Sequence, residues 1–142
     1  MGEIRQVAQE VVDAFNAHDA NRIRALYADN ASFAAPGGVE GGADDAAGYN
    51  MSWLNAFPDA TANVRSELID GDWIVHELEF SGTHEQPLVG PGGTIPATGK
   101  QVTARGIDAI RVSGGKIVEE HLYFDQIGIL SQLGITPESV NA

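Results

Sequence analysis

Residues 101–125 read QVTARGIDAIRVSGGKIVEEHLYFD. Apolar and polar side chains alternate on both sides of the segment Ser113-Gly114-Gly115-Lys116, which is the period of β-strands. Two glycines between alternating runs indicate a tight hairpin turn with a bulge. The stretch therefore predicts two antiparallel strands, 101–112 and 117–125.

The same alternation covers residues 61–69 and 73–81, with Asp70-Gly71 between them as a turn signal. Residues 82–99, rich in glycine and proline, connect this second hairpin to the first. A connection of that length is either functional, here as a rim or lid of a pocket, or a flexible surface loop. The sequence leaves both interpretations open.

The first third of the chain has helical spacing instead. Three helices are predicted: one over residues 3–17, a short one capped by Asp19 and carrying Tyr27, and one capped by Asp44 or Asp45 that ends at Pro58. A glycine-rich loop is expected over 36–42, and a short C-terminal helix capped by Asp125.

Helices followed by strands predict an α+β fold, in which N-terminal helices pack in a curled antiparallel sheet. With 142 residues and no repeat or linker, residues 1–142 are interpreted as a single domain. Such a sheet leaves a conical pocket where the helices do not fill it.

Charge and cysteine content exclude several classes of function. Eight Lys and Arg against 20 Asp and Glu give a net charge of −12, which disfavours nucleic acid and anionic membrane surfaces as partners. Without cysteine there is no disulfide scaffold, thiol nucleophile or cysteine zinc site, and no histidine pair has zinc-ligand spacing. No segment resembles a signal peptide or membrane span, so we expect a cytoplasmic protein.

Two carboxylates fall on apolar strand faces. Asp108 shares its face with Ile110, and Glu120 shares its face with Leu122. A bulge in the turn would make Asp108 and Leu122 cross-strand neighbours and point both acids toward the helices. Burial would raise their pKa values and make them general bases, whereas strand-end charges reaching solvent are the structural alternative.

Other polar side chains also interrupt apolar patterns. Asn50 lies on the apolar face of the third predicted helix, and His76 lies between Ile74 and Leu78. Each is either a hydrogen-bonded core residue or a group that faces a ligand. His84 begins the long loop and could reach the pocket mouth. Aromatic residues that would shape the core or the pocket are Phe15, Phe33, Trp53 and Phe57.

Several local strings, in this order and spacing, resemble the SnoaL-like polyketide cyclase family of the nuclear-transport-factor-two-like cone fold. The strings are WLNAFPD at 53–59, GTH at 82–84, TGK at 98–100, GID at 106–108, GGKIVE at 114–119 and QLG at 132–134. The resemblance spans about residues 4–134, nearly the whole chain. It implies a cone-shaped α+β barrel.

The resemblance also implies a chemistry. Family members close rings by intramolecular aldol condensation with neither metal nor organic cofactor: a carboxylate removes a proton, and the enolate attacks a ketone of the same molecule. Phe15 and Asn50 match positions that line the substrate pocket. The family's catalytic aspartate matches Leu122, and its accompanying histidine matches Asp108.

A base at another position is therefore expected, and three functions remain open. The first is a cyclase or isomerase using Asp108, Glu120 and His76, with an apolar substrate held by Asn50, Phe15, Trp53, Leu122, Phe33 and His84. The second is epoxide opening or another proton transfer by the same groups. The third is a non-catalytic small-molecule binding module. We also expect a homodimer through the convex face of the sheet.

Overall fold

The computed structural model describes residues 2–90 and 93–135. It contains, in chain order, α1 (Gly2–Asn16), α2 (Ala20–Ala25), β1 (Tyr27–Ala35), β2 (Val39–Gly41), α3 (Ala43–Ala56), β3 (Thr61–Asp70), β4 (Trp73–Thr83), β5 (Leu88–Gly90), β6 (Gly93–Ile95), β7 (Gln101–Ser113), β8 (Lys116–Phe124) and α4 (Gln126–Gln132). None of the helices in these ranges is long and apolar enough to cross a lipid bilayer.

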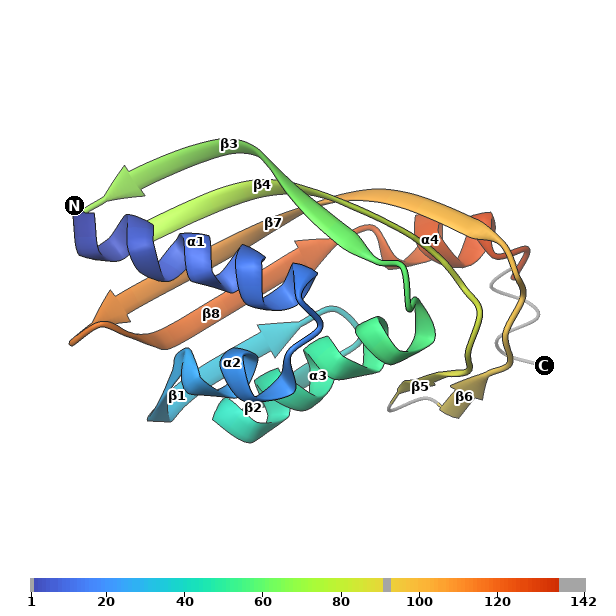
Figure 1. Ribbon diagram of the computed structural model, residues 1–142, viewed down its shortest axis with the longest axis horizontal. Helices are drawn as coiled ribbons and strands as arrows, with labels where there is room; N and C mark the ends of the chain where they lie inside the picture. Colours follow the sequence, from blue (N-terminus) through green and yellow to red (C-terminus); the bar gives the residue numbers. More distant parts are fainter. Residues whose placement is uncertain (1, 91–92, 136–142) are drawn as a thin grey trace.

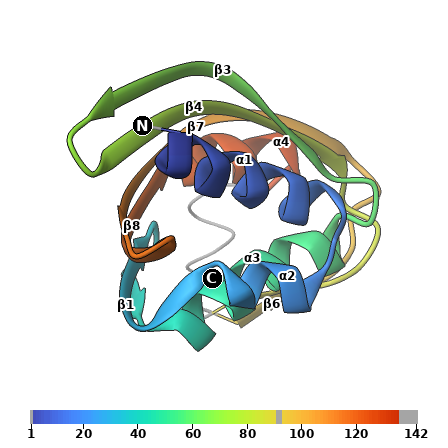
Figure 2. The same ribbon diagram turned by 60° about the vertical axis from the view of Figure 1, so that its left-hand side comes forward.

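The main sheet has six strands in the order β2-β1-β8-β7-β4-β3. It curls around the helices without closing, and α1 and α3 cover its concave side (Figures 1 and 2). The predicted α+β architecture is confirmed. We had expected a fully antiparallel sheet. This expectation is wrong for one pair of strands, because β1 runs parallel to β8.

The segment around Tyr27 differs from the prediction. The second helix ends at Ala25, and Tyr27 opens strand β1 instead of continuing the helix. The apolar residues from Ile23 onward do have helical spacing. The backbone nevertheless pairs with β8, and the Ile117 N–H donates a hydrogen bond to the Leu26 carbonyl at 2.9 Å. The predicted glycine-rich loop over 36–42 likewise contains strand β2, which pairs with β1.

The register of the central strands decides which side chains face the helices. A bulge between Arg111 and Val112 sets Asp108 opposite Leu122. On the other side of β7, Asp108 pairs with His76 of β4. Because cross-strand partners share a face, these three side chains lie in one row on the concave side of the sheet.

Helix starts follow the expected chemistry, with one change. Asp19 accepts a hydrogen bond from the Arg22 N–H, and Asp125 accepts one from the Gly128 N–H. Helix α3 begins after Gly42 instead of at Asp44 or Asp45. The Asp45 carboxylate reaches back to the Gly42 N–H at 2.9 Å and still serves the helix start.

The long connection 82–99 contains a small hairpin, β5–β6. Its base is closed by two backbone hydrogen bonds, from the His84 N–H to the Lys100 carbonyl at 2.9 Å and from the Gly99 N–H to the His84 carbonyl at 2.8 Å. Pro91 and Gly92, part of the predicted loop, lie outside the described residues.

Candidate active site

A cavity of about 110 Å³ lies between helices α1 and α3 and the concave face of the sheet. Six aromatic rings contribute to its wall: Phe15, Phe33, Tyr49, Trp53, Phe80 and Phe124. Several of them pack edge to face, for example Trp53 on Phe124 with ring centroids 5.6 Å apart. Such rings present a rigid apolar wall suited to a flat ligand.

Together with the polar side chains of Asn50 and Arg105, two carboxylic acids, Asp108 and Glu120, line this cavity. Each has only 4% of its surface exposed. They lie on adjacent strands, β7 and β8, as diagonal neighbours: Asp108 is paired with Leu122, and Glu120 lies two residues before Leu122. Burial, the charge of Glu120 and a hydrogen bond to Glu120 together raise the pKa of Asp108 well above its usual range. Burial and this neighbour therefore both favour the protonated form of Asp108.

Glu120 receives a hydrogen bond from a third buried group. The Tyr27 hydroxyl donates to Glu120 Oε1 at 2.5 Å. Burial first, and then the nearby Glu120 charge, raise the pKa of Tyr27 well above its usual value, so it stays a donor. A hydrogen bond from Asn50 acts in the opposite direction on Tyr27. Tyr27 and Asp108 thus both hydrogen-bond to Glu120.

One oxygen of the pair is left without a partner. Asp108 Oδ1 is buried and makes no hydrogen bond to any described residue. A buried oxygen without a partner is costly, so a ligand atom that hydrogen-bonds there would bind favourably. Among the described side chains, no three His, Asp or Glu residues gather in a way that would hold a metal ion.

Seven of the nine predicted site residues lie in the cavity wall: Asp108, Glu120, Asn50, Phe15, Trp53, Leu122 and Phe33. His76 does not. It is buried on the predicted face, but its Nε2 bonds Glu67 Oε2 at 2.8 Å. Glu67 in turn accepts a hydrogen bond from Arg5 at 3.1 Å. His76 is therefore held in a polar row beside Asp108 and outside the wall itself.

His84 also lies outside the cavity wall and does not reach the pocket mouth. Its ring stacks on Phe57 with centroids 5.2 Å apart, and its Nδ1 lies 3.0 Å from Thr98 Oγ1. Phe57 itself is fully buried. The contacts of His84 thus fix the ends of the 82–99 connection to the core.

Tyr27 is the site residue that the sequence did not reveal, because it had been assigned to a helix. One pattern could have found it. Tyr27, Ala31 and Phe33 are all buried positions of β1, and the even spacing between them fits a strand. The pairing with β8 leaves no local signal, because Tyr27 and Glu120 are 93 positions apart in the chain.

The Tyr27 hydroxyl should stabilise the fold through Glu120. For Tyr27→Phe we expect the free energy of unfolding to fall by about 1.5–3 kcal/mol, the usual worth of a hydrogen bond to a charged group. Urea denaturation at neutral pH measures it. Tyr123→Phe is the matched control, because Tyr123 is 60% exposed and should lose almost nothing. Equal losses in both variants would contradict the assigned role.

Comparisons with known proteins agree with the geometry. The family model of the SnoaL-like polyketide cyclases matches residues 5–133. IdmH of Streptomyces antibioticus, proposed to be a polyketide cyclase, is 27% identical and covers 93% of this chain and 99% of its own, with a TM-score of 0.78. AclR of Streptomyces galilaeus, proposed to be a hydroxylase, is 24% identical with a TM-score of 0.82, over 96% of this chain and 88% of its own.

A third neighbour, TsrD of Streptomyces laurentii, is 22% identical with a TM-score of 0.80 and covers 94% of this chain and 96% of its own. A search of curated proteins gives no significant match. The family model covers nearly all of the described residues, including the strands that carry Asp108 and Glu120. The chain belongs to the SnoaL-like polyketide cyclase family.

Proposed function

We propose that the protein is a cofactor-free acid/base enzyme that closes a ring in an apolar, polyketide-like molecule by an intramolecular aldol reaction. The observation that carries this proposal is the buried Asp108–Glu120 pair in an aromatic cavity. Family membership supports the substrate class. The base is this pair, because Leu122 occupies the position that the resemblance gives to the family's catalytic aspartate.

The pair can carry out both proton transfers of the reaction. Asp108 Oδ1, the oxygen without a partner, takes the proton from an acidic carbon between two carbonyl groups, while the shared proton moves onto Glu120. The carbon's electron pair then forms the new bond to a ketone carbon of the same molecule. The ketone oxygen takes the proton back from Asp108, and Glu120 returns the shared proton. No proton is gained or lost overall.

The arrangement also explains why a cavity is needed. Folding one chain so that the enolate carbon faces the ketone converts a rare encounter into the dominant geometry. The rigid rings of Phe15, Trp53 and Phe124 can impose such a fold on a flat molecule. Excluding water from the cavity strengthens the hydrogen bonds at the developing charge.

Proton abstraction is tested directly by deuterium exchange. With 2-acetyl-1-tetralone, a cyclic 1,3-diketone, in D₂O, we expect the protein to accelerate deuterium incorporation at the carbon between the carbonyls, followed by NMR. An epoxide-opening enzyme would instead convert styrene oxide to its diol. Binding of the diketone with neither exchange nor conversion would favour the binding module and contradict the proposal.

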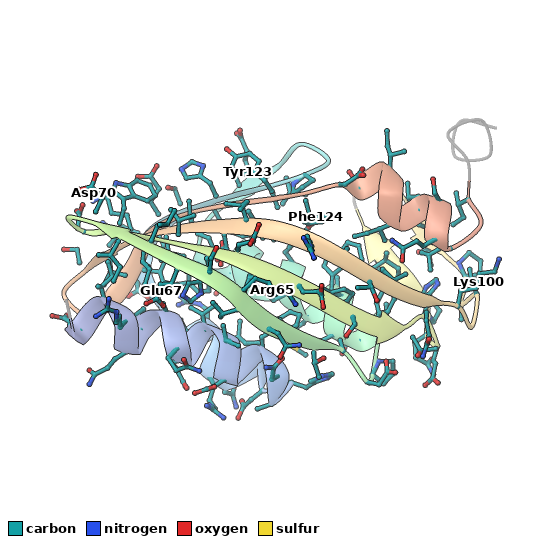
Figure 3. The ribbon with its side chains drawn as sticks, turned by 90° about the horizontal axis from the view of Figure 1, so that it is seen from above. Arg65, Glu67, Asp70, Lys100, Tyr123 and Phe124 are labelled. Atoms are coloured by element: carbon teal, nitrogen blue, oxygen red, sulfur yellow. The ribbon has the colours of Figure 1, made fainter. Side chains whose placement is uncertain are left out.

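We also propose that the protein is a homodimer through the convex face of the sheet. Leu68, Ile107 and Tyr123 lie exposed on this face, on β3, β7 and β8, and Figure 3 shows Tyr123 on it. Large apolar side chains in one exposed region are typical of an interface. Sedimentation equilibrium should give twice the 15.0 kDa chain mass, and a monomer mass would contradict the proposal.

A further inference from the structure

A row of polar side chains crosses the concave side of the sheet next to the cavity. Glu67 of β3 is paired with His76 of β4, and His76 is paired with Asp108 of β7. Directly paired residues have Cβ atoms about 4.5–5.5 Å apart. His76 and Asp108 are buried, whereas the Glu67 side chain is 33% exposed. The row therefore runs from the edge strand of the sheet to a carboxyl that lines the cavity.

Glu67 fixes the hydrogen positions of the His76 ring. Its Oε1 accepts a hydrogen bond from Arg5 Nε of helix α1 at 3.1 Å, and its Oε2 lies 2.8 Å from His76 Nε2. The hydrogen bond from His76 lowers the pKa of Glu67, partial desolvation opposes it, and the hydrogen bond from Arg5 lowers it further. Because an ionised carboxylate can only accept, His76 Nε2 carries the hydrogen. Proton uptake by the ring therefore occurs at Nδ1 and makes His76 a cation.

The surrounding basic side chains leave His76 as the cation next to Asp108. Arg105 also lines the cavity, but its side chain is 66% exposed and its Nε lies 3.7 Å from a carboxylate oxygen of Glu79. Arg5 binds Glu67, which lies one strand beyond His76.

The other titratable side chains around the carboxyl pair cannot supply a positive charge. They are Tyr27 of β1, Tyr49 of α3 and Glu120 of β8. Both tyrosines are neutral, because burial raises the pKa of Tyr27 well above its usual value and that of Tyr49 to about 12. A negative charge on Asp108 is therefore offset by His76 or by no described side chain of this wall.

From these observations we infer that His76, held by Glu67, is a positioning residue that supplies the positive charge against which Asp108 becomes a carboxylate. An adjacent opposite charge favours the ionised form of a carboxyl. With His76 as a cation, the shared proton lies on Glu120, and Asp108 Oδ1 is free to accept the proton of the substrate. This inference deepens the proposed function and rests on it only for the role of Asp108 as base.

Carbon-13 NMR of the side-chain carboxyl carbon tests the inference without any substrate. In protein made with labelled aspartate, the Asp108 signal is the one missing from Asp108→Asn. Its chemical shift reports the pH at which the carboxyl loses its proton. For His76→Gln we expect this midpoint to rise by about one pH unit or more, as for the loss of an adjacent opposite charge. A midpoint that stays the same or falls would overturn the inference.

Glu67→Gln distinguishes action through His76 from direct action on Asp108. Loss of the Glu67 charge destabilises the His76 cation, so we expect the Asp108 midpoint to rise, by less than in His76→Gln. A direct effect has the opposite sign, because loss of a nearby anion favours ionisation of another carboxyl. A fall of the midpoint in Glu67→Gln would overturn the inference, even if His76→Gln did not fold.

The convex face of the sheet supplies matched controls. Glu119 accepts a hydrogen bond from Arg111 Nε at 3.2 Å, and its other oxygen lies 2.7 Å from His121 Nε2. This cluster has the same atoms in contact as Arg5, Glu67 and His76, but His121 is paired with Ala109 and not with a carboxyl. His121→Gln and Glu119→Gln should leave the Asp108 midpoint unchanged. A shift as large as in His76→Gln would overturn the inference.

The pH dependence of deuterium exchange is a second readout. For His76→Gln we expect the enzymatic exchange rate of 2-acetyl-1-tetralone to fall about tenfold below the midpoint, as one pH unit implies, and to recover above it. An equal fall at every pH would indicate a structural role and contradict the inference. If the NMR midpoints move as expected but exchange is absent, His76 acts on Asp108 and the proposed reaction is wrong. If exchange occurs but the midpoint does not rise in His76→Gln, the reaction stands and the role of His76 is wrong.

Discussion

Replacing Asp108 with Asn should lower the rate of carbon deprotonation by about 10²–10⁴-fold, the usual contribution of a positioned general base. Asparagine keeps the shape of the side chain but cannot accept the proton at Oδ1. Deuterium exchange of 2-acetyl-1-tetralone, followed by NMR, measures the loss. Asp70→Asn, the same change at an exposed turn, is the control and should leave the rate unchanged. A rate within about threefold of the unmodified protein would contradict the role of Asp108 as base.

The same variant should not lose stability, which separates lost chemistry from lost folding. Because the pKa of Asp108 is raised in the folded state, the folded protein holds a proton that the unfolded chain releases as the pH rises above about 3.9. Stability from this group is therefore lost as the pH rises from there through the raised folded-state pKa. Asp108→Asn removes this loss, so its stability relative to the unmodified protein should increase with pH, as measured by urea denaturation.

The second large effect is expected at Leu122, where the family resemblance would place an aspartate. Leu122→Asp adds a third carboxyl next to Asp108, its cross-strand partner, and close to the charge on Glu120. Leu122 is only partly buried, so we expect the free energy of unfolding at neutral pH to fall by less than the about 3–5 kcal/mol that an uncompensated buried charge costs. Denaturant titration between pH 4 and 8 measures it, and the loss should grow with pH because the extra carboxyl must stay protonated.

Leu122→Asn is the control for packing, because it removes the same methyl groups without adding a charge. The double variant Leu122→Asp with Asp108→Asn should recover part of the stability, since it returns the cavity to two carboxyls. If Leu122→Asp and Leu122→Asn were equally stable at pH 8, the carboxyl pair would not be the reason for a leucine at this position.

The sequence predicted most of the sheet because four long strands show clear alternation and glycine turns. The face of Asp108 and its pairing with Leu122 followed from a single assumed bulge, which the register confirms. Local patterns could not show that Glu67 would engage His76. Glu67 lies opposite His76 in the register that continues from the β3–β4 turn, and the bulge between Val64 and Ser66 shifts only the pairs farther from that turn.

The missing parts of the site share one physical cause. Strand β1 has small and polar residues, Asp29, Asn30 and Ala31 among them, that hide its alternation, and its partner lies far along the chain. Because strand β1 was not predicted, its first residue, Tyr27, was not identified as part of the site. A second cavity, of about 930 Å³, is lined by the turn between β1 and β2, helix α3, the β5–β6 hairpin and helix α4. The sequence suggested only the 82–99 rim, because the other segments meet it only in the folded chain.

The parallel pairing of β1 with β8 has a consequence for how the protein is made. The Tyr27–Glu120 hydrogen bond joins residues 93 positions apart, so it cannot form until Glu120 has been synthesised. Contacts of such long range form slowly, because the loop must close before any contact compensates for the lost entropy. On the ribosome, the first helices and β1 must therefore wait for β8. The apolar inner face of β1, including Phe33, is left uncovered during this interval.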